Sequence, residues 1–110
     1  MPTSYVFPPM KAGDTYAAIT FTFRSTYSGT PLDFPPGTIA RAQMRDSSSG
    51  DLLMSWPVSV NGNVITLAAV TQSPRPGQHR VDVETTTPDG TVLTWIDGAL
   101  IEVRKDYAHA

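Results

Sequence analysis

The chain has 110 residues, the length of one small domain, and can bury a single modest core. Its formal net charge is −2 and it has no run of Lys or Arg, so no surface for nucleic acid or an anionic membrane is expected. Cysteine is absent, which excludes disulfides and thiolate metal sites.

The N-terminal segment lacks the positive flank and apolar run of a signal peptide, and no window approaches the roughly 20 apolar residues of a membrane span. We therefore expect a soluble protein. Residues 1–11 are apolar and stiffened by proline, which predicts an extended arm. Such an arm either packs on its own domain as an added edge strand or binds a neighbouring subunit. The candidate partner-binding residues are Tyr5, Val6, Phe7, Pro8, Pro9 and Met10.

Alternation of apolar and polar residues with a period of two predicts strands along the whole domain. The expected strands cover residues 16–23, 38–45, 52–56, 57–60, 64–69, 78–85, 92–96 and 99–103. Turn signals separate them, among them the pairs Asn61-Gly62 and Asp97-Gly98. This spacing predicts an all-β fold over residues 12–103: an Ig-like antiparallel β-sandwich of seven to eight short strands, with the extended N-terminal arm. Residues 104–110 are expected to form a flexible tail.

No residue is a convincing catalytic group. His79 shares a strand face with Val81 and Val83, which favours a packed strand residue, and His109 is the second-last residue, where chain ends fray. Without cysteine, a Ser or Thr nucleophile would need an oriented base that the sequence does not supply. We therefore expect no catalytic residues and no enzymatic activity.

The carboxylates Asp82 and Glu84 lie on one strand face together with Arg80. Two carboxylates could serve a glycosidase, but a cross-strand ladder with Arg41 and Arg45 accounts for the same pattern and is favoured.

The remaining aspartates are expected in turns. None follows the spacing of a calcium-binding loop, and no glycine-rich phosphate loop is present. We therefore expect no metal and no cofactor. The residues considered are Asp46, Asp51, Asp89 and Asp97.

The two tryptophans, Trp56 and Trp95, have two possible roles in a sandwich. A tryptophan between the sheets anchors the core, whereas an exposed one can form a stacking platform for a ligand. Alternation predicts that one is buried and leaves open which one faces outward.

Several segments resemble small phage and prophage structural domains, in particular the N-terminal domain of siphophage baseplate upper proteins. The similarity spans about residues 12–103 and consists mostly of turns and alternation. The matching segments are Gly13-Asp14-Thr15, Gly29-Thr30-Pro31-Leu32-Asp33-Phe34, Ala40-Arg41-Ala42-Gln43-Met44-Arg45, Pro76-Gly77-Gln78-His79-Arg80-Val81-Asp82-Val83-Glu84, Pro88-Asp89-Gly90-Thr91-Val92, and the pair Gly98 and Val103.

The resemblance implies a non-enzymatic virion structural protein, either a baseplate or tail-fibre adaptor or a capsid decoration subunit, assembled in the host cytoplasm. Its expected partners are other virion proteins, in a homo-oligomer or a multi-copy symmetric assembly. The alternative is a carbohydrate-binding or adhesion module, which requires an exposed tryptophan in a shallow groove with polar neighbours. A small hydrolase is the third and least favoured possibility.

Overall fold

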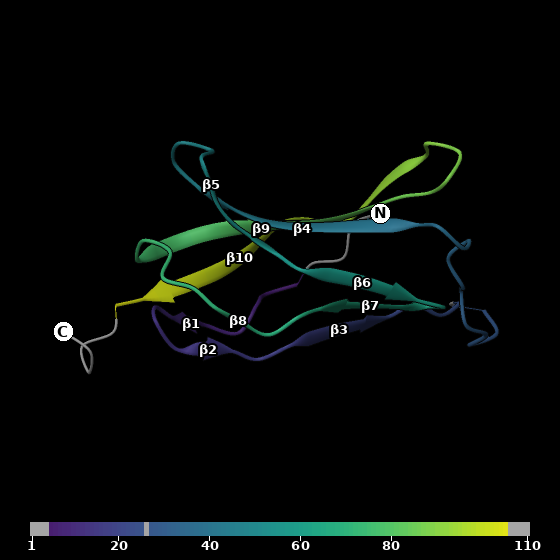
Figure 1. Cartoon of the computed structure of the whole chain (residues 1–110), viewed down its shortest axis with the longest axis horizontal. Coiled ribbons are helices and arrows are strands. Elements are labelled where there is room, and N and C mark those ends of the chain that lie inside the picture. Colours follow the sequence, from purple (N-terminus) through teal and green to yellow (C-terminus); the bar gives the residue numbers. More distant parts are fainter. Residues whose placement is uncertain (1–4, 26, 106–110) are drawn as a thin grey trace.

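In a computed structural model, which describes residues 5–25 and 27–105, the chain forms a two-layered β-sandwich without helices in those residues (Figure 1). One layer is a five-stranded sheet in the order β1-β10-β9-β4-β5, and the other is a three-stranded sheet in the order β3-β7-β6. A pair formed by β2 and β8 extends the second layer. The first sheet contains β1 (Met10–Lys11), β10 (Val92–Arg104), β9 (Gly77–Thr86), β4 (Ile39–Asp46) and β5 (Leu52–Trp56). The others are β3 (Ile19–Thr22), β7 (Val64–Leu67), β6 (Val58–Asn61), β2 (Thr15–Tyr16) and β8 (Val70–Thr71).

The predicted alternation places the core side chains correctly. In β4, Ala42 and Met44 are buried, and in β9 the buried side chains are His79, Val81, Val83 and Thr85, as expected for one inward face. The core is mainly apolar and joins both layers. Its buried members are Phe7, Met10, Tyr16, Ala42, Met44, Met54, Trp56, Ile65, Leu67, Val70, Val81, Val83, Ile96, Ala99, Ile101 and Val103. The predicted all-β sandwich is therefore confirmed.

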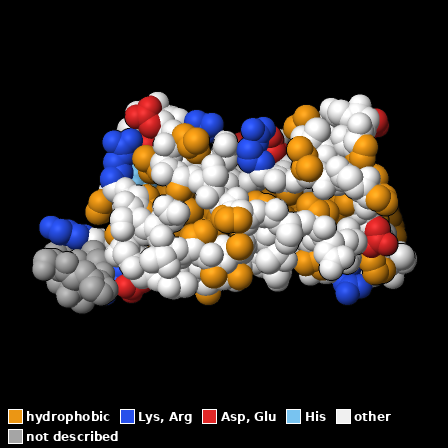
Figure 2. Space-filling view, viewed as in Figure 1, with side chains coloured by type: hydrophobic (Ala, Val, Ile, Leu, Met, Phe, Trp, Pro, Cys, Tyr) orange, Lys and Arg blue, Asp and Glu red, His pale blue; other side chains and the backbone are white. Residues whose placement is uncertain are grey.

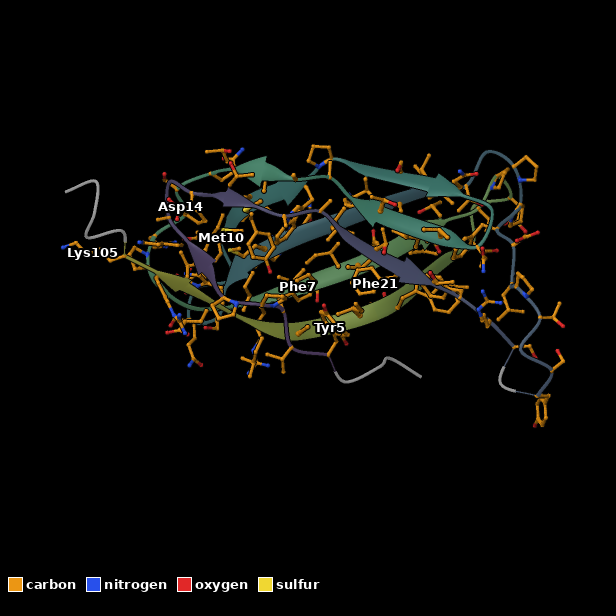
Figure 3. All side chains as sticks on the ribbon, turned by 90° about the horizontal axis from the view of Figure 1, so that it is seen from below. Tyr5, Phe7, Met10, Asp14, Phe21 and Lys105 are labelled. Atoms are coloured by element: carbon orange, nitrogen blue, oxygen red, sulfur yellow. The ribbon has the colours of Figure 1, made fainter. Side chains whose placement is uncertain are left out.

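One long side of the sandwich is closed by the chain itself. Pro57 alone separates β5 from β6, so the chain passes there from the five-stranded sheet to the three-stranded one, and β6 lies against β4. On the opposite side the three-stranded sheet ends in β3, and the five-stranded sheet ends in the short β1, which among the described strands pairs only with the end of β10. The strands β3 and β10 belong to different sheets and do not pair with each other. This second side is where the N-terminal arm lies (Figure 3).

Two predicted boundaries are wrong. Residues 16–23 do not form one strand, because β2 pairs with β8 and β3 pairs with β7, and the chain changes partner at Ala17 and Ala18. Asp97-Gly98 is not a turn between two strands but an irregularity inside the 13-residue β10, where the pairing with β9 shifts. The carboxylate of Asp82 accepts the N–H of Gly98 at 2.6 Å, and Gly98 has a φ of 68°. A glycine with positive φ is typical of a β-bulge, so the strand bends here without reversing.

The arm packs on its own domain. The N–H of Phe7 donates to the carbonyl of Leu100 at 3.0 Å, and β1 pairs in parallel with the end of β10. The side chains of Phe7 and Met10 are buried in the core, whereas Val6 remains exposed. The described part of the arm is thus an added edge strand of its own domain, and binding of a neighbour through its exposed residues stays a prediction. Pro8 and Pro9 are exposed, and the hydroxyl of Tyr16 donates to the Pro8 carbonyl at 2.7 Å. The predicted tail beyond Lys105, including His109, lies outside the described residues.

Candidate functional site

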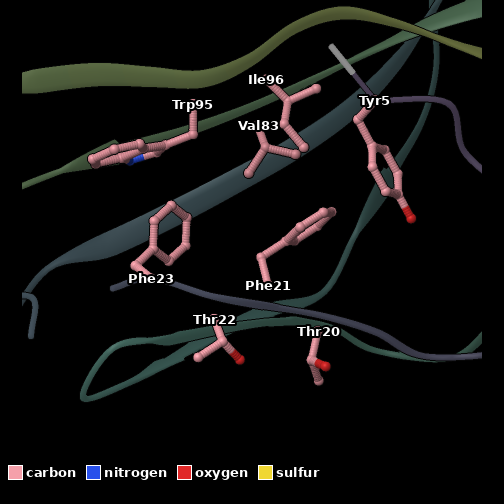
Figure 4. A pocket seen from close by; sticks show the side chains of 8 residues that line it. All are labelled: Tyr5, Thr20, Phe21, Thr22, Phe23, Val83, Trp95 and Ile96. Atoms are coloured by element: carbon pink, nitrogen blue, oxygen red, sulfur yellow. The ribbon is translucent and has the colours of Figure 1, made fainter. Parts of the chain in front are cut away.

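One concave site of the fold is a cleft between the two sheets on the side where β3 faces β10. Its volume is about 330 Å³. Phe21 of β3 and Phe23, which follows β3, point toward Ile96 and Trp95 of β10 and Val83 of β9 (Figure 4). We call this hollow the aromatic cleft; its lining residues are Tyr5, Thr20, Phe21, Thr22, Phe23, Val83, Trp95 and Ile96.

Aromatic rings occupy both ends of the aromatic cleft. At one end, the ring centroids of Phe23 and Trp95 are 4.8 Å apart, and Phe34 lies behind both. At the other end, Tyr5 packs edge-on against Phe21 with centroids 5.4 Å apart. Edge-to-face pairs hold ring orientations fixed, so the apolar walls are formed before any ligand arrives.

The side chains of β3 and of Phe23, the next residue, alternate between the cleft and the opposite direction. Phe21 and Phe23 are partly buried and point into the aromatic cleft, whereas the side chains of Thr20 and Thr22 are exposed and point away from it (Figure 4). This is the period-two alternation expected of a strand at the edge of a sandwich.

The two tryptophans differ in burial, which answers the question that the sequence left open. Trp56 is buried and stacks on Phe7 with centroids 5.9 Å apart. Trp95 is half-buried, lines the aromatic cleft and donates its indole N–H to the hydroxyl of Thr85 at 2.9 Å. Neither indole forms an exposed platform among polar neighbours, so the arrangement does not support the carbohydrate-binding alternative.

The outer face of the five-stranded sheet carries only part of the predicted charge ladder, because Arg45 stands opposite Arg80 and not opposite a carboxylate. Arg41 stands opposite Glu84 and forms an ion pair with it, and Gln43 stands opposite Asp82. On the side of the molecule shown in Figure 2, acidic and basic groups are interspersed and lie mainly along the margins, with hydrophobic side chains between the layers. The side shown in Figure 2 has no extended patch of one charge sign of the kind that binds a polyanion.

His79 is a buried structural residue, as predicted. Its Nε2 lies 2.8 Å from the carbonyl of Arg75 and must carry the proton, because a carbonyl oxygen only accepts. Its Nδ1 is buried without a hydrogen-bond partner, and the nearest carboxylate oxygen, on Asp46, is 4.0 Å away. The guanidinium of Arg75 binds the same Asp46 oxygen at 3.1 Å. This cluster ties two loops together and presents no nucleophile.

The turn aspartates hold their own loops. The backbone N–H groups of Ser48 and Ser49 donate to Asp46 at 2.8 and 3.1 Å, and these bonds lower the pKa of its carboxyl. Hydrogen bonds from Thr87 and Thr91 lower the pKa of Asp89 in the same way. Within residues 5–25 and 27–105, no group of three His, Cys, Asp or Glu side chains is placed to hold a metal ion.

No helix in the described part of the chain has the length and apolar character needed to cross a membrane.

Comparison with known proteins gives matches among solved structures alone. No protein-family model and no curated protein matches the chain. Among solved structures, the chain is similar to the crystal structure of CopC from Methylosinus trichosporium OB3b. The TM-score is 0.51 and the sequences are 14% identical, over 88% of this chain and 84% of CopC. At this identity the likeness establishes the fold alone.

This comparison corrects the expected function. A solved structure that shares the fold is CopC, which is not a phage component, and this finding contradicts the expected virion structural role and the expected location in a virion. The resemblance to baseplate upper proteins gains no support from any of the comparisons. Its motifs were turns and alternation, which β-sandwiches share whatever their function. The expected homo-oligomer stays a prediction.

Proposed function

We propose that this domain is a non-enzymatic binding module that holds a small apolar group in the aromatic cleft. The observation that carries the proposal is the solvent-accessible, ring-lined hollow of about 330 Å³ between β3 and β10. Small-molecule sites typically measure about 300–1,000 Å³ and are lined mostly by apolar and aromatic side chains. The cleft lies at the lower end of this range, so its occupant is one aromatic ring or branched aliphatic group.

Two features support binding over catalysis. The side chains directed into the cleft are almost entirely apolar, and the indole N–H of Trp95 already donates to Thr85. No acid, base or nucleophile of the described residues lines the cleft next to an orienting partner, as general acid–base or covalent catalysis requires. Another hollow of about 600 Å³, between β1, β9 and β10, is lined by charges of both signs and lacks aromatic walls.

Titration with indole, followed by protein NMR, tests the proposal. Trp95 lines the cleft and Trp56 does not. The indole N–H signal of Trp95 is therefore the reporter, and the signal of Trp56 is the internal control. We expect saturable movement of the Trp95 signal with little movement of the Trp56 signal. The Phe23→Ala variant, which removes one wall, should weaken binding at least tenfold, whereas Thr22→Ala, whose side chain points away, should not. Equal movement of both indole signals, or no saturable binding, would refute the proposal.

A further inference from the structure

The strand β3 has a free backbone edge beside the aromatic cleft. In the described part of the chain, β3 pairs with β7 alone. The N–H of Phe23 donates toward the β7 side, to Asn63 at 2.9 Å. Because successive residues of a strand direct their N–H and C=O groups to opposite edges, those of Thr20 and Thr22 point to the open edge.

This edge lacks the features by which free edges are usually protected. Natural edge strands carry charges, proline or bulges, or lie under another segment. The sequence of β3, Ile19-Thr20-Phe21-Thr22, contains no charge and no proline, and its pairing with β7 shows no register shift. By contrast, the pairing of β4 with the outer strand β5 has a register shift, and Pro57 follows β5 directly. Among these edges, β3 is the one that can accept another strand.

The N-terminal arm shows how an extended segment binds on this side of the sandwich. Val6 bridges in parallel to Leu100, the N–H of Phe7 donates to the same residue, and the Phe7 ring enters the core. The described residues of the arm thus cover the edge of β10 and do not pair with β3. Tyr5, the first described residue of the arm, lines the aromatic cleft (Figure 3). The open edge of β3 borders the same cleft, so the arm and an added strand would meet there.

We propose that an extended peptide segment of another protein adds to the free edge of β3 and places an apolar side chain in the aromatic cleft. The inference rests on the function proposed for the cleft. Strand addition supplies backbone hydrogen bonds at Thr20 and Thr22, and the alternating side chains of the added strand supply the group that the cleft holds. The described apolar anchors of the chain's own arm are not the occupant, because Phe7 and Met10 are already buried in the core.

The test uses the heptapeptide Lys-Thr-Val-Phe-Val-Thr-Lys, acetylated and amidated, at millimolar concentration. We expect shifts of the Thr20 and Thr22 amide signals, slower hydrogen exchange at both, and movement of the Trp95 indole signal. Two further peptides carry N-methyl groups, one on both valines and the other on the phenylalanine and both threonines. Because one edge of the added strand pairs with β3, one methylated peptide should lose binding at least tenfold and the other should retain it.

A matched protein variant separates this inference from the function on which it rests. Thr20→Pro removes an N–H from the open edge without removing one from the pairing with β7, and proline is tolerated at such positions. Indole should bind this variant as it binds the wild type, whereas the heptapeptide should bind at least tenfold more weakly. If indole fails to bind the wild type, the proposed function fails.

If indole binds but the heptapeptide does not, or if both methylated peptides bind like the parent, strand addition is overturned. These peptide measurements use the wild-type protein, so they decide the question even if Thr20→Pro does not fold. Sedimentation of the protein alone should show a monomer at the concentrations used. A dimer that Thr20→Pro abolishes would identify a second copy as the occupant and would also overturn the inference.

Discussion

Replacing Phe7 by alanine measures how far the N-terminal arm belongs to the core. Phe7 is 1% exposed, and its ring lies 4.9 Å from that of Tyr5, 6.3 Å from that of Phe21 and 5.9 Å from that of Trp56. Truncating a buried phenylalanine to alanine typically costs about 3–5 kcal/mol, from lost transfer free energy and the cavity left behind. A domain of this size has a total stability of about 5–15 kcal/mol. Phe7→Ala should therefore remove a large share of the free energy of unfolding.

Guanidinium-induced unfolding, followed by tryptophan fluorescence, checks this expectation, because Trp56 stacks on Phe7. We expect a lower midpoint with an unchanged slope, which indicates a change in stability alone. Val6→Ala is the control, since Val6 is 69% exposed and its truncation should change stability by no more than about 0.5 kcal/mol. A loss below about 1 kcal/mol for Phe7→Ala would be too small for a buried core residue. That result would contradict self-packing of the arm and favour an arm that binds a neighbour.

Three further substitutions test other parts of the structure. The folded-state pKa of Asp46 is lowered, so its stabilisation is present above about pH 4 and is lost as the pH falls through the folded value. Asp46→Asn should flatten the acid limb of a plot of unfolding free energy against pH. Burial raises the pKa of Tyr16, so its stabilisation is present below about pH 10 and is lost at higher pH. Tyr16→Phe should cost about 1 kcal/mol at neutral pH, from the lost bond to Pro8, and should reduce the alkaline loss of stability. Gly98→Ala should destabilise by about 1–2 kcal/mol in chemical denaturation because φ is positive there, although the nearest atom to the added methyl would be 3.8 Å away.

Local sequence patterns predicted the strands and turns well, because a strand face or a tight turn is decided by residues that are close together in the sequence. The alternation of Ala42 and Met44 with Arg41 and Gln43 correctly gave the inward face of β4. The Asn61-Gly62 pair correctly gave the hairpin between β6 and β7, in which Gly62 has a φ of 62°. A strand face and a tight turn are decided within a few residues, so a single sequence is enough to identify them.

Features that depend on distant partners were missed. Asp97-Gly98 has the composition of a turn, and only the acceptor on Asp82, one strand away, shows that it is a bulge. The aromatic cleft likewise joins Tyr5, Phe21 and Trp95, which are widely separated in the sequence. Each aromatic residue was visible in its own segment, but their convergence depends on which strands end each sheet. No signal in the individual segments contains that information.

The cleft follows from an asymmetry of the two layers. The three-stranded sheet is narrower than the five-stranded one, and the passage through Pro57 holds its β6 side against β4. The uncovered part of the wider sheet therefore lies at β10, on the other side. The arm fills one stretch of this gap with Phe7, and the stretch between Tyr5 and Trp95 remains open. A strand added to β3 would widen the narrower sheet over the same stretch. The free edge and the ring-lined cleft are thus two consequences of one mismatch in width, which is why we assign them to a single binding event.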